Sequence, residues 1–280
     1  MKNGIIIFLF SLLILSCSTK NETIIFSVMG DIPRSDEEDI LIQEQIKLHN
    51  ELSQAEFMFH VGDIKAGKPP CDEGVYNKVA GYLKKLNVPT FIVPGDNEWN
   101  DCSNPDSAWN FWVKYFMEFE NNWKFETKVY RQNEAKENFA FTSKGVLFIG
   151  LNLVGGLVHD STEWRERHSQ NAQWVKKQFS ENKKNVRAAV IVTQAHPKEK
   201  HEDFITKFLI SAEKFSKPII FIHGDGHRWI YEESWLKPNI IRIQVDQGGI
   251  APPLKLIMNP ESENIISYDR KQFLKTKKNK

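Results

Sequence analysis

The sequence is low in cysteine, shows no excess of charge of either sign, and lacks an apolar run that comfortably spans a bilayer. Its 37 Lys and Arg nearly balance its 36 Asp and Glu, which argues against a nucleic-acid-binding surface. The turn Gly30-Asp31-Ile32-Pro33 also lacks the Gly-x-Gly-x-x-Gly pattern of a dinucleotide-binding turn. With 41% hydrophobic residues over 280 positions, the chain is expected to form one large globular core.

The N-terminus resembles an export signal. Lys2 precedes an apolar run over residues 5–15, which is shorter than the roughly 20 residues of a spanning helix. The run ends in Ile14-Leu15-Ser16-Cys17, which resembles a lipobox. We therefore predict a signal peptide over residues 1–17, lipidation of Cys17, a tether over residues 18–23, and a periplasmic or cell-surface location.

Two alternatives remain for this segment. One is ordinary signal cleavage near Ser18 with an incidental Cys17. The other is a spanning helix, which Ser11, Ser16 and Ser18 disfavour because they shorten the apolar run. Under the lipoprotein interpretation, the membrane is contacted through the lipid anchor only.

Only two cysteines remain after Cys17. Cys71 and Cys102 each follow a Gly-Asp turn by a few residues, and an exported domain sits where disulfides persist. We predict that they form a disulfide beside the site where those turns meet; the alternative is two free, buried thiols.

One arrangement recurs from residue 24 onward. A short run of apolar residues ends in a polar cluster, and a helical pattern follows, which is typical of βαβ units. The predicted strands are residues 24–29, 57–61, 90–93, 189–193 and 219–222, and the predicted helices are residues 36–54, 77–86, 162–181 and 204–215. Because the carboxyl ends of parallel strands share one edge of a sheet, the five polar clusters are expected to lie together.

The remaining strand signals suggest a second sheet. Residues 138–142 and 145–151 look like a hairpin, and residues 240–245, 254–258 and 265–268 look like a closing meander. Residues 101–137, rich in Trp and Phe, are expected to form a helical excursion over the site, and the loop after Asn152 is a candidate for its border. The folded domain is predicted to cover residues 24–270, followed by a basic tail over residues 271–280.

Each strand end carries a side chain able to bind a divalent cation. Carboxylates combined with imidazoles suit Mn, Fe, Zn or Mg more than soft metals, and two such ions need several carboxylates around them. The candidate ligands are Asp31, Asp63, Asp96, His196, Asp225 and His227. A Gly-Asp pair on its own is ordinary turn chemistry, so the argument depends on the five clusters together.

The order of these clusters resembles the signature of the calcineurin-like metallophosphoesterases. In that family the blocks are Gly-Asp, Gly-Asp, Gly-Asn-His-Glu, a lone His, and Gly-His-x-His. Here Gly30-Asp31 looks like the first, Gly62-Asp63 like the bridging aspartate, Gly95-Asp96-Asn97-Glu98 like the third, His196 like the lone His, and Gly224-Asp225-Gly226-His227 like the last. The Gly-Asp-Asn-Glu and His-Gly-Asp-Gly-His variants are similar to an exported bacterial subgroup.

The resemblance implies a two-sheet α/β/β/α sandwich in a single domain. It also implies two divalent metal ions, and hydrolysis of a phosphomonoester or phosphodiester by a metal-bound hydroxide. The substrate would be a small phosphate ester or a phosphorylated polymer end. Arg34 is a candidate for holding a phosphate oxygen, Glu98 for orienting Asn97 or another neighbour of the metals, and His223 for protonating the leaving group.

Three positions depart from the family pattern. Pro33 replaces a His ligand of the first metal, Asn97 stands where the family often has its acid, and Asp225 replaces a His. These departures motivate a second hypothesis, a non-catalytic module of the same fold that binds a metal or a phosphorylated ligand.

Overall fold

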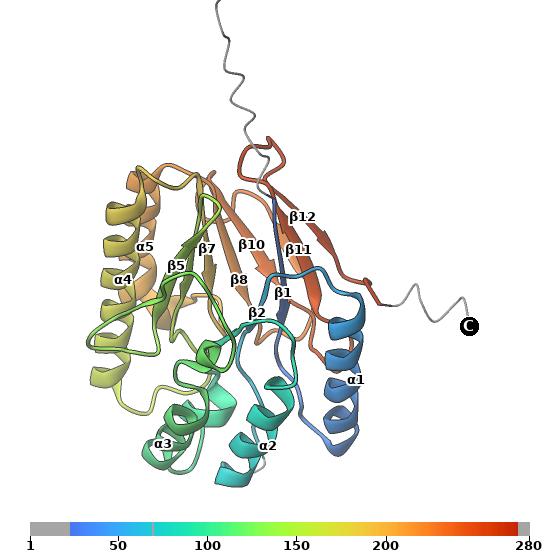
Figure 1. Ribbon diagram of the computed structural model, residues 1–280. Coiled ribbons are helices and arrows are strands. Elements are labelled where there is room, and N and C mark those ends of the chain that lie inside the picture. The colour runs from blue at the N-terminus through green and yellow to red at the C-terminus, as the bar shows by residue number, and fades with distance from the viewer. Residues whose placement is uncertain (1–22, 69, 274–280) are drawn as a thin grey trace, which may run out of the picture.

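The computed structural model describes residues 23–68 and 70–273, in which two β-sheets lie between two layers of helices (Figure 1). The predicted signal peptide, Cys17, nearly all of the tether and most of the basic tail fall outside the described residues. No helix in the described ranges is long and apolar enough to cross a membrane.

The first sheet has five strands in the order β12-β11-β1-β2-β3. Its parallel centre is formed by three consecutive βα units, and β11 runs antiparallel to β1. The strands are β1 (Ile24–Met29), β2 (Phe57–His60), β3 (Thr90–Ile92), β11 (Leu254–Met258) and β12 (Ile266–Asp269). The outer face of this sheet is covered by α1 (Asp36–Leu52), α2 (Glu73–Leu83) and α3 (Pro105–Phe116).

The second sheet has seven strands in the order β4-β5-β6-β7-β8-β10-β9, with β6, β7, β8 and β10 parallel. The strands are β4 (Tyr130–Arg131), β5 (Phe139–Ser143), β6 (Val146–Gly150), β7 (Ala188–Val192), β8 (Ile219–His223), β9 (Ile230–Glu232) and β10 (Ile240–Gln244). Its outer face is covered by α4 (Ser161–Asn182) and α5 (Glu202–Phe215). Three short helical turns complete the chain: η1 (Asp96–Asn100), η2 (Phe119–Asn122) and η3 (Glu199–His201).

Alternation along the strands places apolar side chains on both faces of each sheet. In β2, Phe57 and Phe59 point into the core between the sheets, whereas Met58 packs on the helix side. In β6, Phe148 joins the inter-sheet core and Leu147 faces the helices. Burial on both faces explains why these strands read as continuous apolar runs in the sequence.

The two-sheet sandwich predicted from the sequence is confirmed, and one detail of it is wrong. Residues 240–245, 254–258 and 265–268 do not form one meander: β10 pairs with β8 and β9 in the seven-stranded sheet, whereas β11 and β12 extend the five-stranded sheet beside β1. The physical reason is that β10 is buried beside β8, while β11 covers the otherwise open edge of β1. The four predicted helices occur, and their ends differ from the expected ones by a few residues.

Candidate metal centre

The strands of both sheets bring their polar clusters to one edge of the sandwich. Asp31 follows β1, Asp63 follows β2 and Asp96 follows β3, all from the first sheet. Asp225 and His227 follow β8 from the second sheet. The site therefore spans the two sheets, and the parallel strands of each sheet direct their carboxyl ends toward it.

Two groups of side chains are close enough to share a cation. Asp31, Asp63 and His227 offer ligand atoms that lie within 4.8 Å of one another, and so do Asp63, Asp96 and Asp225. Asp63 belongs to both groups. A carboxylate common to two metal sites is what a pair of ions about 3.5–4 Å apart requires.

The backbone at this edge adopts a conformation that few residues tolerate. Asp31, Asp63, Asp225 and His227 have φ values of 53°, 58°, 62° and 57°, in the left-handed region. Asp and His enter this region more readily than bulky or β-branched residues do, and such conformations cluster at functional sites. Four residues of the two ligand groups have this conformation, which indicates that the backbone here places their side chains for a functional site.

Asp31 provides a direct test of whether a cation fits. Its side chain is fully buried, and neither carboxylate oxygen accepts a hydrogen bond. Oδ1 lies 3.1 Å from His227 Nε2. A buried carboxylate without donors is costly, and a metal ion would satisfy both of its oxygens. The donor set of carboxylates and one imidazole suits a hard or borderline divalent ion.

Four acidic groups at this edge have raised pKa values in the metal-free chain. Burial raises the pKa of Asp63 well above its usual range, and the charges of Asp96 and Glu98 raise it further. Burial likewise raises the pKa of Asp96 to about 6, that of Glu98 to about 7, and that of Asp225. Bound cations would reverse this effect by stabilising the ionised forms.

Gln194, which the sequence analysis did not select, contacts both ligand groups. Its Nε2 donates to Asp96 Oδ1 at 3.0 Å and to Asp63 Oδ2 at 3.3 Å. Its Oε1 accepts from the backbone N–H of Gly155 at 2.7 Å. The signal for it was its position directly after the predicted strand over residues 189–193, the same strand end from which His196 was selected.

His196 and His223 lie next to each other rather than among the carboxylates. Their ring centroids are 5.0 Å apart, and neither belongs to the two ligand groups found among the described residues. His223 is fully buried, its Nδ1 lies 2.9 Å from the carbonyl of Gly224, and its Nε2 accepts from Arg242 Nε at 3.0 Å. Burial lowers the pKa of His223 well below its usual value and that of His196 to about 4. The role of His196 as a metal ligand and the role of His223 as the acid that protonates the leaving group remain predictions.

Glu98 positions the backbone of the ligand loops. It is fully buried, and its Oε1 accepts from the N–H of Gly95 at 2.6 Å and of Asp63 at 3.2 Å. The loops approach so closely that a Cβ on Gly95 would lie 2.3 Å from the nitrogen of Asp63, a distance that only glycine permits. Asn97 donates its N–H toward Asp63 Oδ1 at 3.4 Å. Glu98 thus acts on Asp63 more directly than on the Asn97 side chain.

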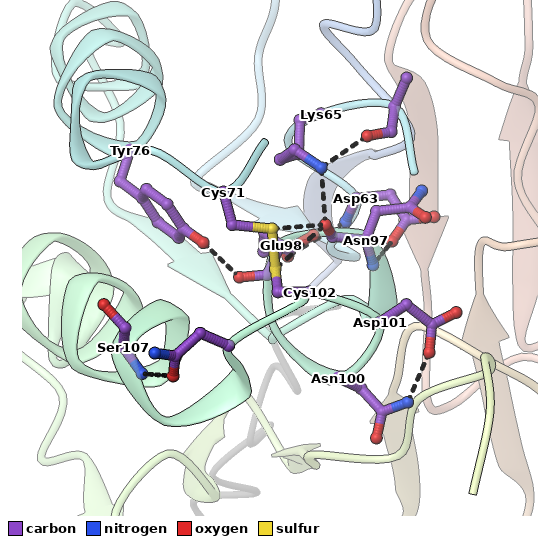
Figure 2. The surroundings of a disulfide bond; sticks show 12 residues. Asp63, Lys65, Cys71, Tyr76, Asn97, Glu98, Asn100, Asp101, Cys102 and Ser107 are labelled. Atoms are coloured by element: carbon purple, nitrogen blue, oxygen red, sulfur yellow. Dashed lines mark hydrogen bonds between the residues drawn. A yellow bond between two sulfur atoms is a disulfide. The ribbon is translucent and has the colours of Figure 1, made fainter. Parts of the chain in front are cut away.

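The predicted disulfide between Cys71 and Cys102 is present beside the site (Figure 2). Its two sulfur atoms lie 3.6 and 3.7 Å from the carbonyl oxygen of Asn97. Lys65, which sequence analysis did not select, is buried and donates to the same oxygen at 2.9 Å. The disulfide and Lys65 together fix the turn that carries Asp96 and Asn97.

Arg34 lies at the rim of the first ligand group. Its Nη1 is within hydrogen-bonding distance of both ring nitrogens of His227. It is partly buried, and its backbone N–H donates to Glu38 Oε2 at 2.8 Å. The guanidinium of Arg34 therefore lies beside the first ligand group. Sequence analysis selected Arg34 as a candidate for binding a phosphate oxygen of the substrate.

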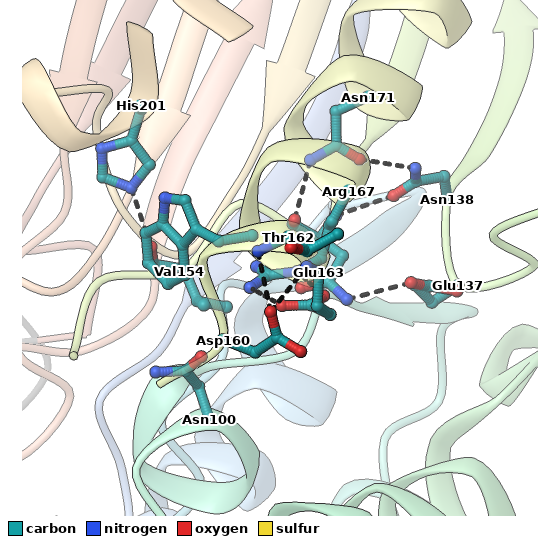
Figure 3. A network of polar contacts seen from close by, with 12 residues as sticks. Asn100, Glu137, Asn138, Val154, Asp160, Thr162, Glu163, Arg167, Asn171 and His201 are labelled. Atoms are coloured by element: carbon teal, nitrogen blue, oxygen red, sulfur yellow. Dashed lines mark hydrogen bonds and ion pairs between the residues drawn. The ribbon is translucent and has the colours of Figure 1, made fainter. Parts of the chain in front are cut away.

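The loop after β6 borders the second ligand group, and a polar network holds it (Figure 3). Asn138 Oδ1 accepts from the N–H of Asn152 at 2.7 Å, and Asn171 donates to the carbonyl of Asn152 at 2.8 Å. His201 Nε2 lies 2.9 Å from the carbonyl of Val154. A Cβ on Gly155 would lie 2.8 Å from Asp96 Oδ2, which shows how near this loop comes to the ligands.

No family model and no curated protein matches the sequence. Solved structures do match. One described as "GAP50 the anchor in the inner membrane complex of Plasmodium" is 11% identical, with a TM-score of 0.55 over 89% of this chain and 88% of that chain. The purple acid phosphatase PPD1 of yellow lupin (Lupinus luteus) is 10% identical, with a TM-score of 0.54 over 90% of this chain and 52% of that one.

A 5'-nucleotidase from Candida albicans is 13% identical, with a TM-score of 0.49 over 88% of this chain and 51% of that one. The chain thus spans about half the length of the two enzymes.

The two-sheet arrangement and the match to the lupin phosphatase define the class of fold: this is the α/β sandwich of the calcineurin-like phosphoesterases. Within it, the strand ends carry carboxylate and imidazole groups that can hold metal. A fold hosts more than one function, so what the chain does must be argued from the site.

Proposed function

We propose that this chain hydrolyses phosphate esters at a centre of two divalent metal ions. The observation that carries the proposal is the membership of Asp63 in both ligand groups. Asp31 and His227 would complete the first metal site, and Asp96 and Asp225 the second. Bound there, the ions supply charge stabilisation of the phosphoryl oxygens and a nucleophile at neutral pH.

The chain's own residues would orient the substrate and the ligands. Arg34, at the rim beside His227, is placed to donate to a phosphate oxygen. Gln194 donates to both Asp63 and Asp96 and so fixes their relative orientation. Glu98 accepts from the backbone of the turns that carry these two residues. Asn97 replaces an imidazole, so we expect the best substrates to be esters with leaving groups of low pKa.

We propose that the protein works outside the cytoplasm, anchored through a lipidated Cys17 as in the exported subgroup that it resembles. The disulfide between Cys71 and Cys102 is compatible with an oxidising compartment.

The test is metal content and turnover of the purified chain. We expect about two Mn per chain, with hydrolysis of an activated aryl phosphate monoester or diester. The Asp63→Asn variant should lose at least about a hundredfold in kcat, because a bridging carboxylate serves both ions. Asp106→Asn, an exposed change in the first turn of α3, is the matched control and should leave kcat unchanged. Wild-type turnover in Asp63→Asn would refute the bridging role.

A second candidate is a binding module without turnover. Pro33 stands where the family has an imidazole ligand of the first metal, and a structural neighbour matched over 88% of its own chain is described as an anchor. This hypothesis predicts that inorganic phosphate binds to the metal-loaded chain while no ester is hydrolysed. Sustained turnover that disappears in Asp63→Asn would exclude it.

A further inference from the structure

A groove runs between α4 and α5 on the outer face of the seven-stranded sheet. Its volume is about 440 Å³, within the usual range for sites of small molecules. Phe179 and Phe215, which are buried, form its apolar floor together with Ile210, which is 52% exposed. The groove reaches the C-terminal ends of both helices, since Lys183 and Lys214 also line it.

Four lysines surround this apolar floor. Lys176 and Lys183 come from α4 and its C-cap, and Lys207 and Lys214 come from α5. None of the four forms an ion pair with a carboxylate of residues 23–68 or 70–273. Residues 173–187 and 207–217 together hold eight Lys or Arg against two Glu, although the whole chain has a net charge of only +1. The positive charge is therefore concentrated here.

The first described residue, Thr23, lies at the same end of the molecule. Lys144 Nζ donates to the carbonyl of Thr23 at 3.2 Å, and the next residue, Gly145, accepts from the N–H of Arg187 at 2.7 Å. Lys217 Nζ donates to the carbonyl of Lys183, at the end of the groove. In Figure 1, β1 begins at the end of the molecule where α4 finishes, opposite the carboxyl ends of β1 and β2.

We propose that the groove between α4 and α5 binds an anionic phospholipid of the membrane surface, with its phosphate among the four lysines and acyl carbons against Phe179, Ile210 and Phe215. Three features select this occupant. The site combines an apolar floor with lysine charge that no described carboxylate neutralises, although Lys183 and Lys207 donate hydrogen bonds to the carbonyl of Lys214 and to Ser169 Oγ. It lies at the end of the molecule where β1 begins, and a lipidated Cys17 would lie within about 20 Å of Thr23 even if the tether were fully extended.

The proposal does not depend on catalysis. The groove belongs to the outer helices, whereas the ligand groups lie at the carboxyl ends of β1, β2, β3 and β8. A chain that binds lipid here would contact the membrane through the groove as well as through the anchor, which departs from the expectation of contact through the anchor only, and it would hold its metal centre away from the bilayer.

The test measures lysine protection in the full chain bound to vesicles. Vesicles of phosphatidylcholine alone are compared with vesicles that also contain phosphatidylglycerol, and lysine acetylation is followed by mass spectrometry. We expect the four groove lysines to react about fivefold more slowly on the anionic vesicles, as an attraction near 1 kcal/mol per lysine implies. Lys114, on α3 and 62% exposed, should react equally on both.

A four-site variant sharpens the test. The variant changes Lys176, Lys183, Lys207 and Lys214 to Gln. In it, the neighbouring Lys177 and Lys184 should be acetylated at the same rate on the two kinds of vesicle. The matched control changes four other exposed lysines, Lys78, Lys114, Lys124 and Lys128, to Gln and should preserve that difference. Both variants should hydrolyse a soluble ester like the unaltered chain.

Equal acetylation of the groove lysines on the two kinds of vesicle would overturn the proposal. It would also be overturned if protection survived about 1 M salt unchanged, because screening at that concentration removes most of an exposed electrostatic attraction. Protection by an acidic soluble protein in the absence of vesicles would assign the groove to a different partner and likewise refute it.

Discussion

At the scale of single residues, Gln194 shows how the site is organised beyond its ligands. It is fully buried, and its three hydrogen bonds join the bridging carboxylate of Asp63, the carboxylate of Asp96 and the loop at Gly155. A side-chain amide in this place holds two negative groups close together without adding charge. Partners of this kind set the orientation of metal ligands and hence the affinity for the metal.

We predict that Gln194→Ala lowers Mn affinity by about 10–100-fold, because Asp63 and Asp96 lose a shared donor and repel each other. The measurement is titration calorimetry of the metal-free chain. His196→Ala is the informative comparison: loss of one metal per chain would make His196 a ligand of the second metal, and unchanged stoichiometry would leave Gln194 as the group from β7 that serves the site. Unchanged affinity in Gln194→Ala would contradict the prediction.

Residue types at strand ends were enough to select Asp31, Asp63, Asp96, Asp225 and His227, which the structure brings together. Gln194 was missed because an amide is a weaker metal-site signal than the imidazole two residues later. Lys65 was missed because a buried lysine that donates to backbone carbonyls cannot be distinguished from a surface lysine in the sequence. The left-handed φ values at four of the ligand positions also require coordinates.

At the scale of elements, the disulfide joins the loop before α2 to the turn after β3. It links cysteines 31 positions apart in the sequence and lies against the carbonyl of Asn97. Since the turn η1 carries Asp96, a constraint on this segment acts on the metal centre as well as on folding.

The double change Cys71→Ser and Cys102→Ser should lower the free energy of unfolding by about 3–4 kcal/mol, the loop-closure value for a segment of this length. We also expect a decrease in activity of about tenfold from looser placement of Asp96. Urea denaturation and steady-state kinetics check the two effects. Reductant should lower stability and activity by the same amounts in the unaltered chain and should not affect the double variant. If reductant still lowered either quantity in the double variant, loss of the disulfide would not be the cause.

Asp160 caps α4, and its carboxylate accepts from the N–H of Thr162 at 2.7 Å and of Glu163 at 3.2 Å. Asp160→Ala should therefore cost about 1 kcal/mol of stability with metal affinity unchanged. Thermal denaturation and metal titration separate the two effects. Loss of metal would show that this residue serves the site rather than the helix.

Among the elements, the buried strands and the helices were predictable because each shows an apolar pattern typical of its kind. The sheet to which β11 and β12 belong was not predictable. The partner of a strand depends on which sheet edge remains open after the rest has folded, and the residues of the strand itself do not show this. The split of β10 from β11 thus follows from tertiary packing.

At the scale of the whole molecule, burial of acidic groups makes metal and protons compete. In the metal-free chain the pKa is about 6 for Asp96 and about 7 for Glu98, above their ordinary values. Groups with a raised folded-state pKa contribute stability that is lost as pH rises through that pKa. Buried His49 and His60, each with a pKa of about 4, act in the opposite direction and lose their contribution as pH falls below about 6.5.

We predict that saturating Mn raises the melting temperature more at about pH 8 than at about pH 5.5, because the ions bind the ionised carboxylates. Scanning fluorimetry at both pH values measures this difference. Asp63→Asn should show little shift at either pH. An equal shift at both pH values in the unaltered chain would mean that the carboxylates do not carry the metal.

The polarity of the strands has a consequence for what the protein can reach. The chain enters at the amino end of β1, and the metal centre begins beyond its carboxyl end. Six residues of strand measure about 20 Å, roughly twice the distance over which physiological salt screens a charged surface. In the proposed orientation, an anionic bilayer would not repel a negatively charged ester from the catalytic edge. The protein would sample solutes of the surrounding fluid at nearly their bulk concentration while remaining attached to its membrane.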